Sequence, residues 1–242
     1  MHKRILALSA LTLAACSGEE PGLLDRHVAA MGGEAALEAV TGIRLELDIT
    51  EPTFNVRGVY QAERPDSMRI DIYADGTRVF TEALDQGQSW QMFADGDAHA
   101  TTEAAADILL RGLHGNLYGP HEYAALGHTI TEGEPVEIDG IVYPTLDFAM
   151  ADGFEERLYL DPETYLPVRD RSEYALHPDV NPDEEYHETR RSDFTMIEGV
   201  MFPMLQETVD LRTGETVQTV RIISVEINPE FDPGTFAISS DD

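Results

Sequence analysis

The chain has 242 residues, of which 46 are acidic and 16 are lysine or arginine, so its formal net charge at pH 7 is −30. This charge argues against nucleic acid as a partner, because phosphates require a basic face, and against electrostatic docking on anionic lipid. Hydrophobic residues make up 42% of the chain, which indicates a globular protein rather than a disordered one. The acidity itself favours solubility over a cationic cargo as its explanation.

The N-terminus has the pattern of a bacterial secretory signal. Basic residues at positions 3 and 4 precede an apolar run at 5–14, which is shorter than the about 20 residues that span a bilayer. Leu13-Ala14-Ala15-Cys16 is similar to the lipobox of bacterial lipoproteins, whose cysteine is diacylated and becomes the mature N-terminus. Cys16 is the only cysteine, so it has no disulfide partner within the chain. A signal peptide with an incidental cysteine is the alternative.

These features predict the domain organisation. We expect a lipoprotein signal peptide at residues 1–15, a lipidated tether at 16–22 and a single domain at 23–242. Two or three acyl chains on Cys16 would hold the protein stably on a membrane. Ser17, rather than aspartate, follows the cysteine, which in lipoproteins of enterobacterial type implies export to the outer membrane.

Helical and then alternating patterns open the predicted domain. Short helices are expected at residues 23–31 and 34–40. From Ile43 to Thr50 every odd residue is apolar and every even residue is polar, which predicts a strand with one dry and one wet face. The alternation recurs up to residue 93, with turn signals at Asp75-Gly76 and Gln86-Gly87. Five sequential strands are therefore expected to form a meander.

The rest of the chain predicts a central helical segment and further strands. A cap at Thr102 predicts a helix at residues 104–111, ended by Gly112, and a short helical piece follows at 121–126. Strands are expected near 129 and at 136–138, 141–148, 155–160, 166–174, 186–194, 201–209 and 215–228, the last with a bulge at Ile222-Ile223.

The predicted fold class is mainly β (α+β). We expect a half-open antiparallel β-barrel, or strongly curved sheet of about 11 strands, with a helical lid and short N-terminal helices. A sheet of this size with a continuous apolar concave face is either filled by its helices or holds a ligand.

Several local patterns resemble one known family. Residues 64–69, Arg-Pro-Asp-Ser-Met-Arg, resemble the Arg-Pro entry to an inner strand of bacterial lipoprotein carriers. Residues 85–92 resemble the strand with Asp-Gly-x-x-x-Trp that follows it there, and 160–167, 193–203 and 231–236 also fit. Over residues 22–238 the chain is similar to LolA/LolB-like proteins, the outer-membrane lipoprotein-sorting superfamily. The resemblance implies a half-open barrel with a helical lid over an apolar cavity for acyl chains.

The resemblance also implies residue roles. Arg64 matches an arginine that hydrogen-bonds the lid shut and drives cargo handover in the soluble carrier, and an arginine that flanks Pro65 at a strand start is the alternative. Trp90 would face or seal the cavity, or belong to the core. The leucines of the lid would contact acyl chains, or pack permanently on the sheet. The expected cavity or ligand-binding residues are Arg64, Met68, Ile70, Phe80, Trp90, Met92, Leu109, Leu110, Leu113 and Phe148, and Cys16 is the expected lipidation site.

No common catalytic signature occurs in the sequence, whether a Gly-x-Ser-x-Gly elbow, a Walker loop, a Rossmann fingerprint or His-Glu-x-x-His. His114, His121 and His128 are seven residues apart, but intervening glycines and a proline argue against a shared helix and hence against a metal site. Residues 179–183 resemble the start of a calcium loop without its glycine or its bidentate glutamate, so a solvated acidic loop is favoured. No catalytic residue, metal or cofactor is expected.

The predicted function is that of an envelope lipoprotein that binds the acyl chains of a lipid or lipoprotein in its half-barrel, for carriage or reception at the outer membrane. Transfer would be passive, driven by differential burial of apolar surface. The expected partners are acyl chains, the membrane that holds the anchor and an envelope protein, and the expected location is the periplasmic face of the outer membrane. The alternatives are a periplasmic sensor or interaction module with the same fold, and a hydrolase with an unrecognised site.

Overall fold

A computed structural model of the chain describes residues 20–94 and 96–238. The expected signal peptide, Cys16 and most of the expected tether lie outside the described residues. Within residues 20–94 and 96–238, no helix is long and apolar enough to cross a membrane.

The helices lie near the N-terminus and in the centre of the chain, as predicted. They are α1 (Leu23–Ala30), α2 (Glu34–Glu38), α3 (Glu103–Leu117) and the 3-10 helix η1 (Pro120–Leu126). The predicted end of α3 at Gly112 is wrong, because the helix continues for five more residues. A glycine in a helix costs about 1 kcal/mol, whereas burial of a leucine contributes about 1.5–3 kcal/mol. Leu113 and Leu117 are 0% and 2% exposed, so their burial outweighs the glycine cost.

The described residues form one antiparallel sheet of thirteen strands. The strands are β1 (Gly42–Glu51), β2 (Phe54–Glu63), β3 (Ser67–Ala74), β4 (Thr77–Asp85), β5 (Gln88–Phe93), β6 (His99–Ala100), β7 (Thr129–Ile138), β8 (Ile141–Ala149), β9 (Glu155–Leu160), β10 (Pro167–Tyr174), β11 (Glu185–Ile197), β12 (Val200–Asp210) and β13 (Thr216–Ile227). Their order is β6-β5-β4-β3-β2-β1-β13-β12-β11-β10-β9-β8-β7. The first five strands are therefore the predicted meander, and the sheet stays open between β6 and β7.

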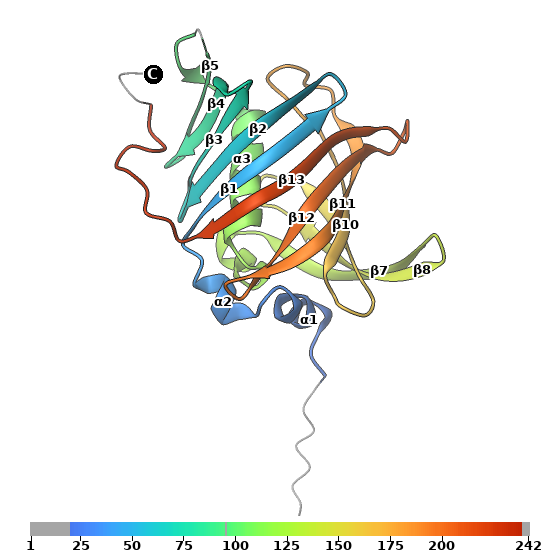
Figure 1. Ribbon diagram of the computed structural model, residues 1–242. Coiled ribbons are helices and arrows are strands. Elements are labelled where there is room, and N and C mark those ends of the chain that lie inside the picture. The colour runs from blue at the N-terminus through green and yellow to red at the C-terminus, as the bar shows by residue number, and fades with distance from the viewer. Residues whose placement is uncertain (1–19, 95, 239–242) are drawn as a thin grey trace, which may run out of the picture.

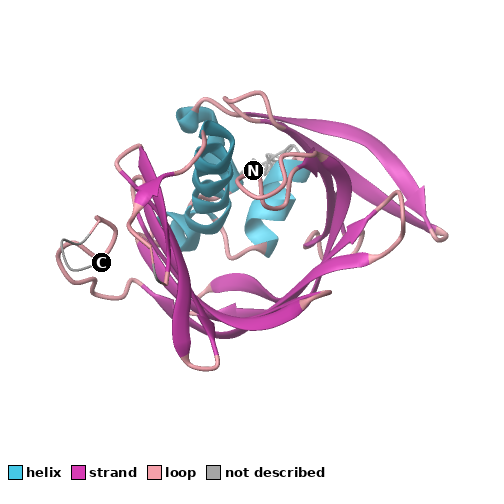
Figure 2. Cartoon of the chain, turned by 90° about the horizontal axis from the view of Figure 1, so that it is seen from above, coloured by secondary structure: helices cyan, strands magenta, loops and turns pink. Residues whose placement is uncertain are grey.

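The sheet curves around the helices, which lie inside the curve (Figure 2). The predicted fold class is confirmed, with thirteen strands rather than about eleven. The bulge in the last strand is also confirmed. Glu46 pairs with Ser224 and Leu47 pairs with Ile222, so Ile223 has no opposite residue of its own on β1. A bulge of this kind adds local twist, which helps a long sheet to curl.

Two apolar clusters fill the inner side of the sheet. The larger joins the inward residues of β1 to β4 and β12 to the leucines of α3, with Ile43 and Leu113 both 0% exposed. The smaller lies beneath η1, where Tyr123 packs on Leu146 and Leu158. The helices thus cover the concave face by burying apolar side chains against it.

Trp90 and Met92 do not face the concave side, which corrects the prediction for both. Trp90 is paired with Ala83, the neighbour of the inward-facing Leu84, so the pleat of the sheet directs the indole outward. Its Nε1 donates to the carbonyl oxygen of Phe236 at 3.0 Å. The chain after β13 runs along this side of the sheet (Figure 1) and covers the indole. Alternation along the strand cannot reveal that Trp90 is buried on the outer face, because the segment that covers it is distant in the sequence.

Candidate functional site

The C-terminal end of α3 is tied to the sheet by Arg64, in the turn between β2 and β3. Its guanidinium donates to the carbonyl oxygen of Leu117 at 2.6 Å and to both carboxylate oxygens of Glu122 at 2.6 and 2.9 Å. The same group lies 4.1 Å from the ring centroid of Tyr118. Burial raises the pKa of Glu122, but the hydrogen bonds from Arg64 and Gly119 lower it on balance. One arginine therefore holds both α3 and η1.

The N-terminal end of α3 is held by residues 175–184, the segment between β10 and β11, here called the strap. Asp179 of the strap accepts hydrogen bonds from the backbone and hydroxyl groups of Thr102, and from Gln91 Nε2 at 2.8 Å. The strap also reaches β1, where His177 Nε2 lies 2.9 Å from Glu51 Oε1. Thr102 caps the helix as predicted, accepting from the amide of Ala105 at 3.3 Å. Polar contacts thus secure α3 at both ends.

The expected acidic loop at residues 179–183 belongs to this strap. The carboxylate of Asp179 is used in hydrogen bonds to Thr102 and Gln91. Across residues 20–94 and 96–238, no group of three or more histidine, aspartate or glutamate side chains is arranged to hold a metal ion. His114 and His128 do meet, with Nδ1 and Nε2 at 2.9 Å, and His128 Nδ1 accepts from the amide of Ala151.

A groove of about 1040 Å³ runs over the rim of the sheet beside the strap. Its inner part lies between α3, which contributes Ile108 and Arg111, and the concave face, which contributes Glu156 and Tyr174. Its outer part passes over the other face of the sheet. The lining residues of the outer part include Arg157, Tyr159, Arg171 and Tyr186. The groove therefore connects the interior of the half-barrel with its outer surface.

A buried group of charged side chains, here called the charged floor, lies under the inner part of the groove, and one of its members, Glu156, lines the groove. Burial, the charge of Asp170 and a hydrogen bond with that residue raise the pKa of Glu156 to about 8, although Arg191 opposes the shift. Arg191 forms an ion pair with Asp170, whose side chain is 5% exposed. The resemblance implied an apolar cavity within the half-barrel, whereas these three side chains, from the adjacent strands β9, β10 and β11, are polar. The interior combines apolar walls with a polar base.

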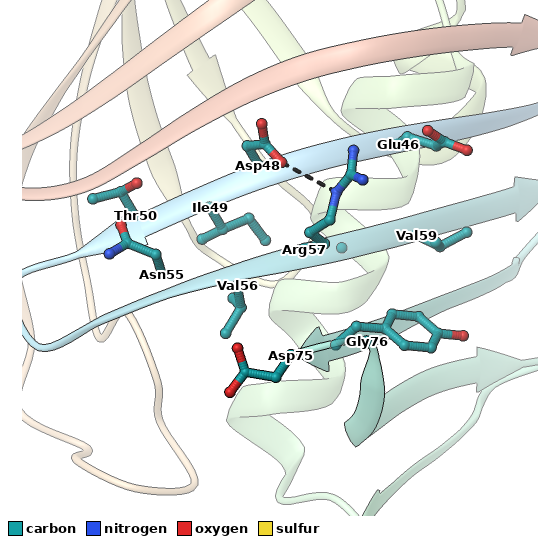
Figure 3. A pocket seen from close by; sticks show the side chains of 12 residues that line it. Glu46, Asp48, Ile49, Thr50, Asn55, Val56, Arg57, Val59, Asp75 and Gly76 are labelled. Atoms are coloured by element: carbon teal, nitrogen blue, oxygen red, sulfur yellow. Dashed lines mark ion pairs between the residues drawn. The ribbon is translucent and has the colours of Figure 1, made fainter.

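A second hollow, of about 580 Å³, lies over β1, β2 and β3 (Figure 3). Arg57 points toward Asp48 there, and Nε lies 3.3 Å from Oδ1 in an exposed ion pair. The remaining lining side chains include Thr50, Asn55 and Val59. Arg57 is therefore an exposed arginine on the outer surface whose charge is neutralised by one carboxylate, and it serves as a control for the variants proposed later.

Comparisons with known proteins add to this geometry. No family model matches the sequence, and no curated protein matches it either. Solved structures do match. A LolA superfamily protein from Nitrosomonas europaea superposes with a TM-score of 0.57 at 13% identity, over 88% of this chain and 97% of that one. The chain has the LolA/LolB-like fold.

Two further structures share this LolA/LolB-like fold. A protein of the DUF1329 family from Desulfovibrio piger gives a TM-score of 0.60 at 11% identity, over 88% of this chain and 95% of that one. A domain described as an outer membrane lipoprotein-sorting protein, from Vibrio parahaemolyticus, gives 0.57 at 9% identity, over 89% and 94%. Identities this low establish the fold alone.

The LolA/LolB-like fold brings most of the predicted cavity residues to the inner side of the sheet. Met68, Leu109 and Leu113 belong to the larger apolar cluster, and Ile70 and Leu110 pack against it. The remaining two inner residues lie further along the sheet. Phe80 lies on the same face as Leu84, and its ring centroid is 5.1 Å from that of Phe93. The ring centroid of Phe148 is 5.7 Å from that of Tyr123.

Only some of these residues border an open space. Among the predicted residues, Phe148 lines the rim groove, whereas Met68, Leu109 and Leu113 are buried within the larger apolar cluster. Sequence reasoning missed the strap and the charged floor. The signal for the floor was Asp170 and Ser172, polar residues at the inward phase of a predicted strand.

Two buried glutamates, Glu156 of the charged floor and Glu82 of β4, predict how the free energy of unfolding depends on pH. Burial raises the pKa of Glu156 to about 8 and, with the charge of Asp179, that of Glu82 to about 7, against an ordinary value of 4.5. The folded state therefore keeps protons that the unfolded state releases above pH 4.5. The stability that these two glutamates contribute is complete below pH 4.5 and is lost as pH rises through their folded pKa values of about 7 and 8. Buried histidines with lowered pKa values, such as His27 at about 4, oppose this only below pH 6.5.

Between pH 6.5 and 8, the free energy of unfolding is therefore expected to fall, by up to about 1.4 kcal/mol per pH unit for each such group. Urea denaturation across this range measures the slope. Glu156→Gln should make the slope shallower, whereas Glu155→Gln, at the exposed neighbouring position, should leave it unchanged. Equal slopes in the two variants would contradict the assignment to Glu156.

Proposed function

We propose that this protein binds the acyl chains of a lipid or lipoprotein between its curved sheet and α3, and carries or receives them at the cell envelope. One observation carries the proposal. Helix α3 buries an apolar face on an apolar concave sheet, while polar contacts hold its two ends, through Arg64 and Asp179. Polar contacts through Arg111 and His114 hold another side of the helix. The fold, shared with a LolA superfamily protein and a lipoprotein-sorting domain, supports the same proposal.

In such a site, apolar contacts with an acyl chain replace apolar contacts within the protein. An acyl chain that enters beneath α3 replaces the contacts that Leu109 and Leu113 make in the closed state, so little apolar surface becomes exposed. The fastenings at each end are hydrogen bonds and an ion pair, which water can replace at a net cost of about 0.5–1.5 kcal/mol for each hydrogen bond. Opening is thus driven by the ligand and needs no covalent step.

The proposal includes the envelope location. Cys16 is proposed as the acylated N-terminus, residues 1–15 as the signal peptide and 23–242 as the domain that binds the ligand. The periplasmic face of the outer membrane is the proposed site of action. No catalytic role or cofactor is proposed.

Native mass spectrometry with lipid extraction tests the proposal. The chain from Ser17 onward is exported behind a cleavable signal, purified from the periplasm and examined for bound phospholipid or acylated peptide. Co-purification of either, with uptake of an apolar fluorophore, is the expected result. A clean apo-protein that takes up no fluorophore would show that the interior is permanently filled, and the protein would then be an interaction module.

Arg64→Gln tests whether α3 is the lid. Loss of the ion pair with Glu122 and of the bond to Leu117 should speed hydrogen exchange in residues 103–126 and speed transfer of the fluorophore to acceptor vesicles, each by about 10-fold for a loss of about 1.4 kcal/mol. Arg57→Gln removes an exposed arginine with one partner and is the matched control. Identical exchange and transfer in the two variants would contradict a latch at Arg64.

A further inference from the structure

Four arginines gather on the outer face of β9, β10 and β11. In the strand pairing, Arg171 lies directly opposite Arg157, and Arg169 lies directly opposite Arg190. These four side chains, here called the arginine cluster, are among only fifteen arginines in a chain with a net charge of −30. Like charges directly opposite each other in a sheet are destabilising. Two such pairs side by side therefore require a compensating feature.

A single buried carboxylate supplies part of that compensation. Glu188 is 1% exposed and accepts from Arg169 Nη1 at 2.9 Å, from Arg190 Nε at 2.7 Å and from Arg171 Nε at 2.8 Å. Burial raises the pKa of Glu188, but hydrogen bonds from Arg190 and Arg171 lower it on balance, so it is ionised near neutral pH. Three guanidinium groups around one carboxylate leave two positive charges unmatched.

The fourth arginine is neutralised separately. Arg157 donates to both carboxylate oxygens of Asp147, at 2.6 and 3.0 Å. Other acids lie nearby, since Glu207 is opposite Arg190 and Glu173 follows on the same face of β10. In the part of the chain that the structure describes, neither carboxylate forms an ion pair with the cluster. The excess charge therefore persists locally, although the protein as a whole is strongly acidic.

Aromatic rings lie against two arginines of the cluster and help to orient them. The guanidinium of Arg169 lies 5.7 Å from the ring centroid of Tyr143, and that of Arg171 lies 5.2 Å from that of Tyr159. Planar guanidinium groups held this way lose little freedom when they bind a ligand. Arg190 has a side chain 48% exposed and contacts Glu188 through Nε, and its terminal nitrogens have no hydrogen-bond partner among the described residues.

The rim groove passes over this surface, with Arg157, Arg171, Tyr159 and Tyr186 in its lining. An excess of two positive charges, presented by planar guanidinium groups with free N–H donors, matches a tetrahedral dianion, which accepts several charge-assisted hydrogen bonds at once. We propose that the arginine cluster binds a phosphate group, either free phosphate or the phosphomonoester of a lipid headgroup. The site is separate from the space beneath α3 and does not depend on the function proposed above.

Isothermal titration of the full mature chain in a non-ionic detergent tests the site at about 0.15 M ionic strength, where long-range repulsion from the acidic surface is screened. The probes are inorganic phosphate and micelles doped with phosphatidate, with phosphatidylcholine micelles as the neutral lipid reference. Binding of either phosphate probe supports the site. Tighter binding of phosphatidate identifies a headgroup as the source, and binding of inorganic phosphate alone identifies the free ion.

Variants decide whether the cluster is responsible. Arg190→Gln should weaken binding at least about 10-fold, the effect of losing a charge-assisted contact worth about 1.4 kcal/mol. Arg169→Gln provides a second test, because Arg169 lies opposite on the neighbouring strand. Arg57→Gln, on the outer face of β2 with its own partner Asp48 (Figure 3), should bind as the parent does.

Thermal unfolding identifies any variant that fails to fold. No binding of either probe by the parent chain would overturn the proposal. Equal binding by a folded Arg190→Gln protein and by the Arg57→Gln control would also overturn it, because the phosphate would then lie elsewhere.

Discussion

Replacement of Glu188 by glutamine is expected to lower the free energy of unfolding by about 3 kcal/mol. The carboxylate is 1% exposed and is the shared partner of Arg169, Arg171 and Arg190. The substitution leaves three like charges crowded on two neighbouring strands around a neutral amide. The expected loss is at the lower end for a broken buried ion pair, because the side chains of these arginines are 20–48% exposed and water can partly replace the lost partner.

Urea denaturation of Glu188→Gln measures this loss. Glu207→Gln is the matched control, since Glu207 lies opposite Arg190 on β12 but is an exposed residue, and its replacement should change stability by less than about 0.5 kcal/mol. Similar stabilities in the two variants would show that the arginines do not need the buried acid. Inorganic phosphate should restore part of the stability of Glu188→Gln by taking the place of the missing charge.

Replacement of Leu113 by alanine is expected to lower the free energy of unfolding by about 2–5 kcal/mol. Leu113 is 0% exposed in the centre of the larger apolar cluster, where α3 meets the inward face of the sheet. Truncation removes buried apolar surface and leaves a cavity that neighbouring side chains fill only in part. Chemical denaturation gives the size of the loss, and hydrogen exchange shows whether α3 opens before the sheet unfolds.

Leu110→Ala is the control for the same helix. Leu110 is only partly buried against the cluster, so its truncation should cost less than that of Leu113. Equal costs would mean that α3 does not pack on the sheet through the face seen here. A loss confined to faster exchange in residues 103–117, with the main unfolding transition unchanged, would indicate a helix that opens independently of the sheet.

The fold could be predicted largely because its signals are local. Alternation from Ile43 to Thr50 determines which side of β1 faces inward, and a change of alternation within β13 marks the bulge at Ile223. The length of α3 could not be predicted in this way. Gly112 and Gly115 are local signals to stop, and they are overridden by burial of Leu113 and Leu117 on a sheet that lies elsewhere in the sequence.

The candidate sites depended on information that no single segment holds. The arginine cluster exists because the registers of β9, β10 and β11 place Arg157 beside Arg171 and Arg169 beside Arg190. A one-residue shift in either register would separate these side chains onto opposite faces. The burial of Trp90 on the outer face similarly depends on the segment near Phe236 that covers it. Single-strand patterns contain neither kind of fact.

The positions of the two ends of α3 indicate how the protein would be oriented relative to a membrane. The helix is 15 residues long, which corresponds to about 22 Å, and it runs from the strap at one end to α2 and η1 at the other, beside α1 (Figure 1). With Cys16 acylated as proposed, the seven residues at 16–22 reach at most about 25 Å and join α1 directly. The end with α1 would thus rest near the bilayer, while the rim groove and strap point into the periplasm, toward an arriving donor.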